Sequence, residues 1–485
     1  MAKTIAEIVS ELGNISIIGN ASAEVTSVEL DSRKCSKGSL FVAQKGVAAD
    51  GHGFIPKVFE QGCRAVLCEV APSNYPVDAV VVVCPDTHVA LGIVASAFYN
   101  HPSHQLKLVG VTGTNGKTTT ATLLYRLMMK LGHKAGLFST VANYIGTDKE
   151  DAKQTTPDAV TLNKKMSEMV SQGCEYCFME VSSHSVVQHR ISGLDFDGAI
   201  FSNITHDHLD YHKTFDNYIN AKKAFFDGLK KEAFAITNID DKNGLKMLQN
   251  TKATKKTYSL RTLADFKARI VEHSFEGMLI DFNGTEAFMQ FVGKFNAYNL
   301  LGIYAAAVCL GFSSADVLVA LSSLTPVDGR FETIRSADGR TAIVDYAHTP
   351  DALMNVISTI NDIRKPEQNL ICVVGCGGDR DKTKRPEMAR EAVNGSTQVV
   401  LTSDNPRSEE PEQILADMTA GLTPDDMRKT LVIADRHEAI RTALTLARKG
   451  DIVLIAGKGH EPYQEIKGVK HHFDDREEVR AFFGL

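Results

Sequence analysis

The stretch Leu108-Val109-Gly110-Val111-Thr112-Gly113-Thr114-Asn115-Gly116-Lys117-Thr118-Thr119-Thr120 decides the fold of this chain. An apolar run typical of a buried β-strand ends in a glycine-containing loop, and a helical pattern of apolar residues follows. A strand, a glycine loop and a helix in this order predict a phosphate-binding site, because loop N–H groups and the helix N-terminus face the anion. Lys117 is placed to reach the terminal phosphates of a nucleotide, and Thr118 can offer a hydroxyl to Mg²⁺.

This loop departs from the general phosphate-binding motif. The motif has a glycine five residues before the glycine of Gly-Lys-Thr, and that position is Val111 here. We expect Gly113 to supply the backbone freedom instead. The alternative is a glycine turn with a purely structural use, but Gly-Lys-Thr in this context favours nucleotide binding.

Length and composition bound the class of protein. A chain of 485 residues predicts about three domains. A net charge of −6 argues against a general polyanion binder such as a DNA-binding protein. We see no signal peptide in residues 1–20, and apolar runs such as residues 79–84 are too short to cross a bilayer. We therefore expect a cytoplasmic monomer that binds small molecules, without nucleic acid or membrane insertion.

The cysteine pattern indicates reduced thiols. The nine cysteines are scattered along the chain, and an odd number does not suit a disulfide framework. Cys174 and Cys177 have CxxC spacing, but no second Cys or His pair follows at the spacing of a zinc site. We expect buried structural thiols rather than a metal or redox site.

The alternation of apolar strands and helices predicts an α/β protein with three domains. We place a small α/β domain at residues 1–105, a central ATPase-type domain with a mostly parallel sheet at 106–331, and a Rossmann-like domain at 332–485. Residues 255–295 alternate in the manner of β-strands, which predicts an antiparallel extension of the central sheet.

Polar side chains near predicted strand ends are candidates for a site. Glu180 ends a buried strand, where carboxylates line the ligand crevice of parallel sheets, so it is a candidate Mg²⁺ ligand or else a capping or solvated group. The histidine- and aspartate-rich loop 205–212 suits Mg²⁺ with one His ligand better than zinc, and a solvated loop is the alternative. Lys222 and Lys223 lie on an amphipathic helix, where lysines are ordinarily surface charges.

Further candidates lie beyond this point. Asn296 and Asn299 share a helix face, from which they could cap the helix or touch a base. In the third domain, loops after three strands (375–382, 404–407 and 457–461) should converge at one sheet edge. The glycines of the first loop resemble a dinucleotide fingerprint only superficially.

Taken together, these segments resemble the Mur ligase family over nearly the whole chain. The motifs that carry the resemblance are Gly113 to Thr119, Glu180 to His184, Asp207 to Asp210, Gly329 to Glu332 and Asp345 to Pro350. Leu30 to Arg33 and Gln188 to Arg190 are similar to the diaminopimelate-adding members. On local pattern alone, the turn at Ser32 could equally be solvated. The resemblance implies ATP-dependent amide bond formation through an acyl phosphate.

The resemblance also implies roles for residues. The implied ATP-binding residues are Gly113, Thr114, Asn115, Gly116, Lys117, Thr118, Thr119, Asn296, Asn299, Arg330 and His348. The implied catalytic residues are Lys117, Glu180, His208 and Lys222. Two Mg²⁺ ions would be held at Thr118, Glu180, His208 and Lys222, with Lys222 converted by CO₂ to a carbamate (N6-carboxylysine).

Two further substrates follow from the same resemblance. UDP-N-acetylmuramoyl-L-alanyl-D-glutamate would contact Leu30, Ser32, Gln154, Thr155, Thr156, Ser182, Gln188 and Arg190, with Gln154 where the family often has asparagine. Meso-diaminopimelate would contact Arg385, Asp404, Asn405, Pro406, Arg407, Gly457 and Glu461. Arg407 suits the distal carboxylate of diaminopimelate and would repel the ammonium of lysine. Out of this context, Arg407 would be read as half of a surface ion pair.

Other functions fit parts of the pattern. A lysine-adding Mur ligase and a folylpolyglutamate synthetase-like ligase share the loop and the reaction logic, but the segment 404–407 and the uridine-type first domain argue against them. A non-enzymatic nucleotide switch is the alternative from another class. Its nucleotide binding or hydrolysis would not depend on the muramoyl peptide.

Overall fold

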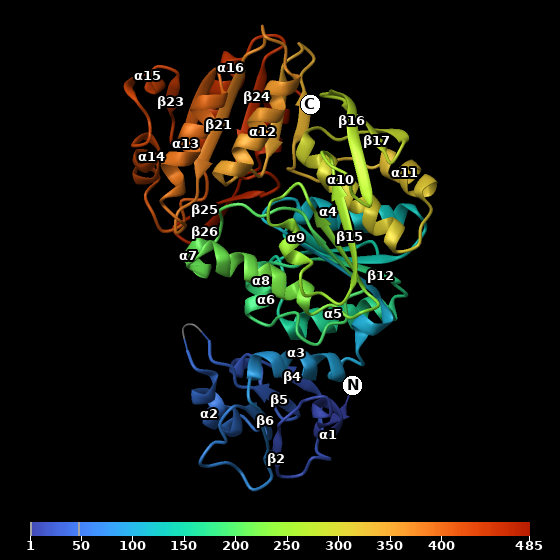
Figure 1. The fold of residues 1–485 in the computed structure, drawn as a ribbon. Helices are drawn as coiled ribbons and strands as arrows, with labels where there is room; N and C mark the ends of the chain where they lie inside the picture. Colours follow the sequence, from blue (N-terminus) through green and yellow to red (C-terminus); the bar gives the residue numbers. More distant parts are fainter. Residues whose placement is uncertain (1, 47–48) are drawn as a thin grey trace.

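The computed structural model describes residues 2–46 and 49–485, and three large sheets follow one another along an elongated molecule (Figure 1). The first sheet lies at one end, the second in the middle and the third at the other end (Figure 1). The fold is a mixed α/β fold of three domains with a mostly parallel central sheet, as the sequence predicts.

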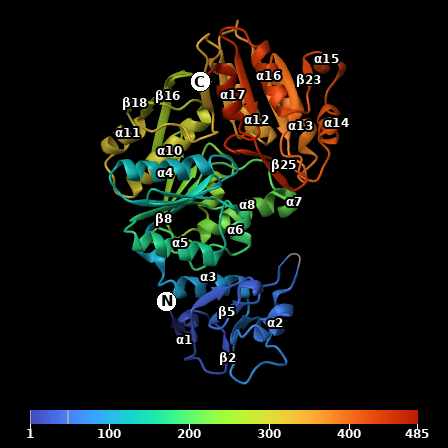
Figure 2. The ribbon, with the colours of Figure 1, turned by 180° about the vertical axis from the view of Figure 1, so that it is seen from behind.

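The first sheet has the strand order β2-β7-β6-β5-β4, parallel except between β2 and β7. Its strands are β2 (Ser16–Ile18), β4 (Ser27–Glu29), β5 (Ser39–Val42), β6 (Ala65–Cys68) and β7 (Val80–Val83), beside a small pair β1 (Lys3–Thr4) and β3 (Glu24–Val25). Its helices are α1 (Ile5–Val9), α2 (Ile55–Glu60) and α3 (Thr87–Phe98). In both views α3 lies against the next domain, where Ala159 joins its apolar cluster (Figures 1 and 2).

The central sheet has the order β11-β10-β9-β12-β8-β13-β14-β15-β16-β17-β18. Its strands are β8 (Lys107–Thr112), β9 (Ala135–Phe138), β10 (Ala142–Ile145), β11 (Asp148–Asp151), β12 (Tyr176–Glu180), β13 (Gly198–Phe201), β14 (Phe234–Asn238), β15 (Thr254–Ser259), β16 (Phe266–Ser274), β17 (Gly277–Phe282) and β18 (Thr285–Met289). Its helices are α4 (Lys117–Lys130), α5 (Ala159–Ser171), α6 (Ser183–Val187), α7 (Leu209–His212), α8 (Phe215–Asp227), α9 (Gly244–Met247), α10 (Lys294–Cys309) and α11 (Ser314–Ser322).

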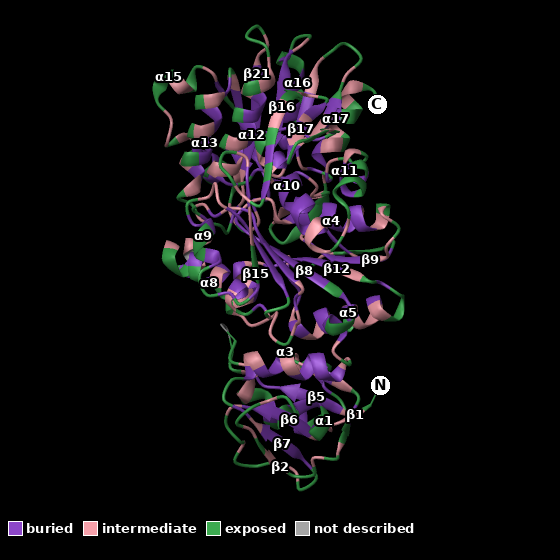
Figure 3. Ribbon diagram, turned by 45° about the vertical axis from the view of Figure 1, so that its right-hand side comes forward, coloured by how far each residue is buried: buried purple, intermediate pink, exposed green. Residues whose placement is uncertain are grey.

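Two apolar clusters bury the two faces of this central sheet. Residues of α4, α10 and α11 form the cluster on one face, and residues of α5 and α8 form the cluster on the other. The inner strands β8, β12, β13 and β14 are therefore almost entirely buried (Figure 3). This explains why β8 and β12 read as nearly continuous apolar runs, as expected for parallel strands covered on both faces.

The predicted antiparallel extension is only partly confirmed. β15 and the start of β16 pair in parallel, and antiparallel pairing begins between β16 and β17 and continues to β18. The last strand of this extension, β18, ends at Met289, before the end of the predicted alternation at residue 295. The hairpin of β10 and β11 was not predicted, because β11 is an exposed, charged edge strand without apolar alternation.

The third sheet has the order β19-β20-β24-β21-β22-β23, parallel except between β19 and β20. Its strands are β19 (Glu332–Arg335), β20 (Thr341–Asp345), β21 (Leu370–Cys376), β22 (Gln398–Ser403), β23 (Thr430–Val432) and β24 (Ile452–Ala456), followed by a hairpin of β25 (Tyr463–Ile466) and β26 (Val469–His472). Its helices are α12 (Pro350–Ile363), α13 (Lys384–Gly395), α14 (Pro411–Thr419), α15 (Pro424–Met427), α16 (Arg436–Leu446) and α17 (Asp475–Phe483). The strands β24, β21 and β22 are neighbours, so the loops that follow them meet at one edge, as predicted.

Candidate active site

The phosphate loop connects β8 to α4 and is shaped by two glycines. Gly116 has φ +88°, in the left-handed region that favours glycine, and a Cβ there would lie 2.4 Å from Asn299 Oδ1. Gly113 has φ +152°, and a Cβ there would lie 2.0 Å from Ser202 Oγ. Gly113 therefore takes the place of the glycine that the general motif has at Val111, which instead lies buried in β8.

Lys117 begins α4 and lies over this loop. Its Nζ donates to the carbonyls of Gly113 at 2.9 Å and Thr114 at 2.8 Å. Burial lowers the pKa of Lys117, against the pull of the Glu180 carboxylate. The next residue, Thr118, accepts a hydrogen bond from Arg330 Nη2 at 3.3 Å, so the segment that leads into the C-terminal domain meets the loop directly.

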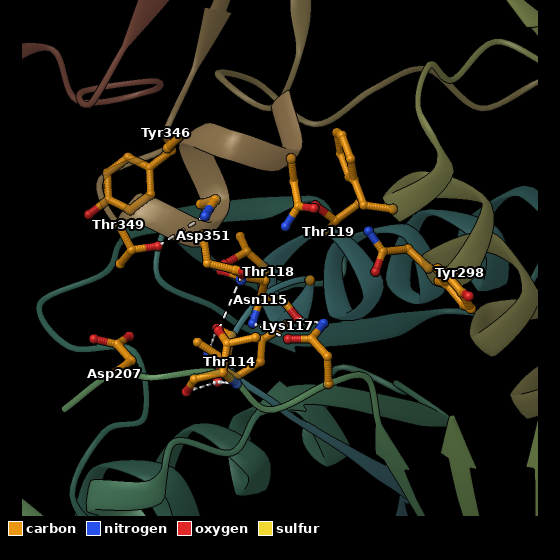
Figure 4. A pocket seen from close by; sticks show the side chains of 18 of the residues that line it. Thr114, Asn115, Lys117, Thr118, Thr119, Asp207, Tyr298, Tyr346, Thr349 and Asp351 are labelled. Atoms are coloured by element: carbon orange, nitrogen blue, oxygen red, sulfur yellow. Dashed lines mark hydrogen bonds between the residues drawn. The ribbon is translucent and has the colours of Figure 1, made fainter. Parts of the chain in front are cut away.

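A cavity of about 860 Å³ lies between the phosphate loop and the C-terminal domain (Figure 4). In the close view, Tyr346, Thr349 and Asp351 of the C-terminal domain face the loop residues Thr114 to Thr119 (Figure 4). The predicted residues that line the cavity are Thr114, Asn115, Gly116, Lys117, Thr118, Thr119, Gln154, Thr155, Thr156, Glu180, Ser182, Arg190, His208, Lys222, Asn299, Arg330 and His348. Gly113, Asn296 and Gln188 lie just outside it.

The two helical asparagines have different surroundings. Asn296 donates to the carbonyl of Val292 at 2.8 Å, which ties the first turn of α10 to the segment before it. Asn299 donates to Asn296 Oδ1 at 3.3 Å and lines the cavity beside Gly116. Asn296 thus supports the helix end, while Asn299 is the one placed to touch a nucleotide.

Glu180 is a buried carboxylate at the end of β12. It is 1% exposed, and its Oε1 accepts a hydrogen bond from the N–H of Thr140 at 2.6 Å. Across the described part of the chain it takes part in no ion pair within 4.0 Å. A buried carboxylate with a single backbone donor is well suited to a cation, because burial of an uncompensated charge is costly.

His208 lies on the loop before α7, with its ring 5.0 Å from that of His184 and its Nε2 3.5 Å from Asp207 Oδ2. Partial burial and the ammonium groups of Lys117 and Lys222 lower the pKa of His208 to about 4, against the pull of Asp207. A neutral imidazole is the form that binds a metal. Among the described residues no group of three or more His, Cys, Asp or Glu is placed to share an ion; the predicted set combines His208 and Glu180 with a hydroxyl and a lysine.

The expectation of a surface charge at Lys222 is wrong. Its side chain lies in α8 at 1% exposure, with Nζ 2.8 Å from the Gly113 carbonyl and 4.6 Å from the centre of the Tyr218 ring. Burial and the nearby ammonium of Lys117 lower its pKa well below the ordinary value. Lys223 is the less buried residue of the pair, and it forms an i,i+4 ion pair with Asp227 at 2.6 Å.

A second polar cluster lines the same cavity near β12. Arg190 Nη1 donates to Gln154 Oε1 and to the carbonyl of Thr156, both at 2.8 Å, and Arg190 also donates to Gln188. Thr156 Oγ1 donates to the Glu180 carbonyl at 2.7 Å, so this cluster is tied to the candidate metal ligand. Leu30 and Ser32 lie apart in the first domain, where Leu30 is 43% exposed.

Side chains of the C-terminal loops form a dense network. Asn405 Oδ1 accepts from Lys458 Nζ at 3.2 Å and from the Glu465 N–H at 2.9 Å, while Asn405 Nδ2 donates to Glu461 Oε2 at 2.8 Å. A Cβ on Gly457 would lie 2.7 Å from Asp404 Oδ2, so glycine lets the two loops approach. Arg407 has φ +51° and donates from Nη1 to the Gly378 carbonyl at 2.7 Å.

Arg385 is placed differently from the other predicted amino-acid contacts. It is 1% exposed, with bidentate hydrogen bonds to Glu409 at 2.9 and 2.8 Å and a further one to Asp417 at 2.7 Å. Its guanidinium is thus largely satisfied by the protein. Direct contact with a bound amino acid stays a prediction for Arg385.

Contacts across the domain boundary were not predicted from the sequence. Asp351, in the first turn of α12, accepts hydrogen bonds from Asn115 Nδ2 at 2.9 Å and Thr205 Oγ1 at 3.2 Å. Lys384 forms an ion pair with Asp207 at 2.6 Å. The partners are far apart in sequence. The only local indication was Asp351, an acidic residue directly after the Thr349-Pro350 start of a helix.

The three domains, the phosphate loop and the cleft beside a Rossmann-like domain are those of a nucleotide-binding α/β protein. Three family models match the chain: Mur ligase family, catalytic domain, at residues 24–99; Mur ligase middle domain, at 111–308; and Mur ligase, glutamate ligase domain, at 329–459. The chain belongs to the Mur ligase family.

Similar proteins cover the whole chain. It is 56% identical over 479 residues to a Bacteroides fragilis protein and 58% identical over 467 residues to one from Parabacteroides distasonis, with 99% and 96% of each chain covered. Both are named UDP-N-acetylmuramoyl-L-alanyl-D-glutamate--2,6-diaminopimelate ligase. A solved structure with the same protein name is 34% identical, with a TM-score of 0.71 over 100% of this chain and 99% of that one.

The nine cysteines are free thiols, and seven of them are buried, as predicted. A search of the helices in the described residues finds none that could span a membrane.

Proposed function

We propose that this chain joins meso-2,6-diaminopimelate to UDP-N-acetylmuramoyl-L-alanyl-D-glutamate at the expense of ATP, as a cytoplasmic monomer in peptidoglycan precursor synthesis. One observation carries this proposal: curated relatives named for that ligation are 55–58% identical over nearly the full length. The cleft described above supports it, since it brings a phosphate loop, a polar cluster at Arg190 and the C-terminal domain to one cavity.

Activation of a carboxylate is the chemical problem of such a reaction, because oxide is a poor leaving group. The D-glutamyl γ-carboxylate attacks the γ-phosphorus of ATP, the bond to ADP breaks, and an acyl phosphate forms. The amino group of diaminopimelate then attacks the acyl carbon, and phosphate leaves as the amide forms. Positioning and charge neutralisation are the work left to the protein. Lys117 is suited to that neutralisation, because its ammonium lies over the phosphate loop.

The residues beside the loop fit the two Mg²⁺ ions that the family resemblance implies. Glu180 is a buried carboxylate without an ion-pair partner in the described chain, and Thr118 offers a hydroxyl next to Lys117. Hard oxygen donors of this kind are those that Mg²⁺ prefers. His208 would complete the set as a neutral imidazole, and the bound ions would neutralise phosphate charge.

Lys222 fits the role of a carbamylated lysine. Carbamate formation needs a neutral amine, and burial favours that form of Lys222. The carbamate would carry a negative charge in the place of a buried ammonium, close to Gly113 and facing the cavity. That change converts an unpaired cation into a group able to support the second Mg²⁺.

The first and C-terminal domains would select the UDP-muramoyl dipeptide and diaminopimelate, respectively. Leu30 and Ser32 would hold the uridine end on the first domain, and the cluster around Arg190 would hold the peptide. Arg407 and Glu461 would bind the distal carboxylate and ammonium of diaminopimelate, respectively. Asp404, Asn405 and Gly457 shape this part of the site.

Phosphate release tests the proposal. Purified protein with ATP and Mg²⁺ should release phosphate only when both the UDP-muramoyl dipeptide and meso-diaminopimelate are present, and substituting lysine should slow release strongly. Release that ignores either substrate would contradict a ligase with these substrates and would favour a nucleotide switch. Equal rates with lysine would contradict the role of Arg407. Folate substrates should give no release above background.

A further inference from the structure

Tyr346 lies between the nucleotide end and the amino-acid end of the cleft, and no role has been assigned to it above. It is the first residue after β20 and lines the cavity opposite the phosphate loop (Figure 4). Its two functional parts, the ring face and the hydroxyl, contact different sites. This division makes it possible to separate their effects by substitution.

The ring of Tyr346 supports Arg330. The Arg330 guanidinium carbon lies 4.5 Å from the ring centre, which is the geometry of a cation–π contact. Arg330 in turn donates to Thr118 of the phosphate loop at 3.3 Å. The ring therefore orients a cation that reaches the nucleotide site.

The hydroxyl of Tyr346 points to the amino-acid site. It donates to Glu461 Oε1 at 3.4 Å, while Glu461 Oε2 accepts from Asn405 at 2.8 Å. The bond from Tyr346 is the longer of the two. Lys458, completely buried, lies 3.5 Å from Glu461 and fixes the other side of that carboxylate.

The backbone around Tyr346 is built for a fixed position. The Tyr346 N–H donates to the Gly329 carbonyl at 3.0 Å, one residue before Arg330. Gly459 has φ +53°, and a Cβ there would lie 2.7 Å from the Tyr346 Cβ. Three chain segments thus cross in contact at this point, and glycine is what lets them do so. A side chain held from both neighbours in this way cannot shift independently of either site.

We propose that Tyr346 is a positioning residue that couples the two sites, with its hydroxyl setting Glu461 for the amino-acid substrate and its ring setting Arg330 for the nucleotide. The identity of the amino acid rests on the proposed function; the nucleotide half does not. Occupancy of one site then favours the arrangement that the other site needs, through contacts that are continuous from Glu461 to Thr118.

Two substitutions separate the halves of this role. Tyr346→Phe keeps the ring and removes the hydroxyl; Tyr346→Leu removes both. We expect Tyr346→Phe to raise the KM for diaminopimelate about fivefold and to leave the Kd of ADP, measured by calorimetry, within about 1.5-fold of wild type. Tyr346→Leu should raise both the KM for diaminopimelate and the Kd of ADP by about fivefold. Tyr304→Phe is the matched control, because its hydroxyl pairs with Ser314 at the start of α11 and neither residue lines the cavity.

The outcomes decide the inference. A selective effect of Tyr346→Phe on diaminopimelate supports it. Unchanged KM values in Tyr346→Phe, or equal losses for both ligands in that variant, overturn it, and the melting temperature shows whether folding is altered. If the wild type does not turn over diaminopimelate, the proposed function fails. The role of the ring can still be tested then, by comparing the Kd of ADP in Tyr346→Leu with that in Tyr346→Phe. A double-mutant cycle of Tyr346→Phe with Glu461→Gln should show non-additive KM effects.

Discussion

The phosphate loop and the C-terminal loops that we propose to bind the amino acid are built in different ways. Residues 113–119 form one contiguous segment, which offers N–H groups of the main chain and one lysine. The amino-acid loops come from separate strand ends, and their shape depends on side-chain contacts such as Asn405 with Lys458 and Glu461. The main-chain loop keeps its place between β8 and α4 although Val111 replaces the glycine of the general motif, whereas we expect a side-chain network to depend on each of its members.

Substitution of Lys117 should have the largest effect. Lys117→Met removes the ammonium that lies over the phosphate loop, and we expect ligation to fall about 10³-fold. Steady-state phosphate release measures this loss. Lys130→Met, at the exposed end of the same helix, is the matched control and should act like wild type. A small effect of Lys117→Met would mean that main-chain groups alone suffice.

Lys222 comes next. Lys222→Ala removes the proposed carbamate, and we expect ligation to fall about 10²-fold, since one anionic support for Mg²⁺ is lost. Millimolar acetate or formate should restore part of the activity in this variant alone. Lys223→Ala breaks only the surface ion pair with Asp227 and should remain active. Native mass spectrometry of the wild type should show the added mass of CO₂, and its absence together with failed rescue would refute the modification.

Substitution of Arg407 tests the C-terminal loops in the same way as substitution of Lys117 tests the phosphate loop. Arg407→Lys should raise the KM for diaminopimelate about 30-fold, because an ammonium cannot reproduce a planar fork, while the KM for ATP stays the same. Arg428→Lys, in an exposed pair with Asp425 of the same domain, is the control. Equal changes in both KM values would show that the amino-acid loops and the phosphate loop do not act separately.

Val111 should have the smallest effect on ligation. Val111→Gly restores the glycine of the general motif, yet Val111 is fully buried in β8. We expect the change to lower the free energy of unfolding by about 3 kcal/mol and to alter the KM for ATP less than twofold, because Gly113 already shapes the loop. Val109→Gly, in the same strand, should destabilise similarly. Tighter ATP binding in Val111→Gly would break the account given for this loop.

The contrast also explains what the sequence could predict. The phosphate loop and the strand before Glu180 are contiguous patterns, so their position and character follow from local residues. The burial of Lys222 does not follow from local residues, since an amphipathic pattern does not say which of two adjacent lysines faces inward. Contacts such as Asp351 with Asn115 depend on how two domains dock, and local propensity carries no information about that.

The ion pair of Lys384 with Asp207 has a consequence for how the enzyme responds to its medium. Each partner directly precedes a predicted site residue, Arg385 or His208, so the pair ties the two ligand sites together. The side chains are 24% and 10% exposed, so dissolved ions reach the pair and screen it in part. Added salt should therefore weaken this contact between the central and C-terminal domains only modestly. Because Asp207 also lies 3.5 Å from His208, any such weakening should be felt at the candidate metal site as well.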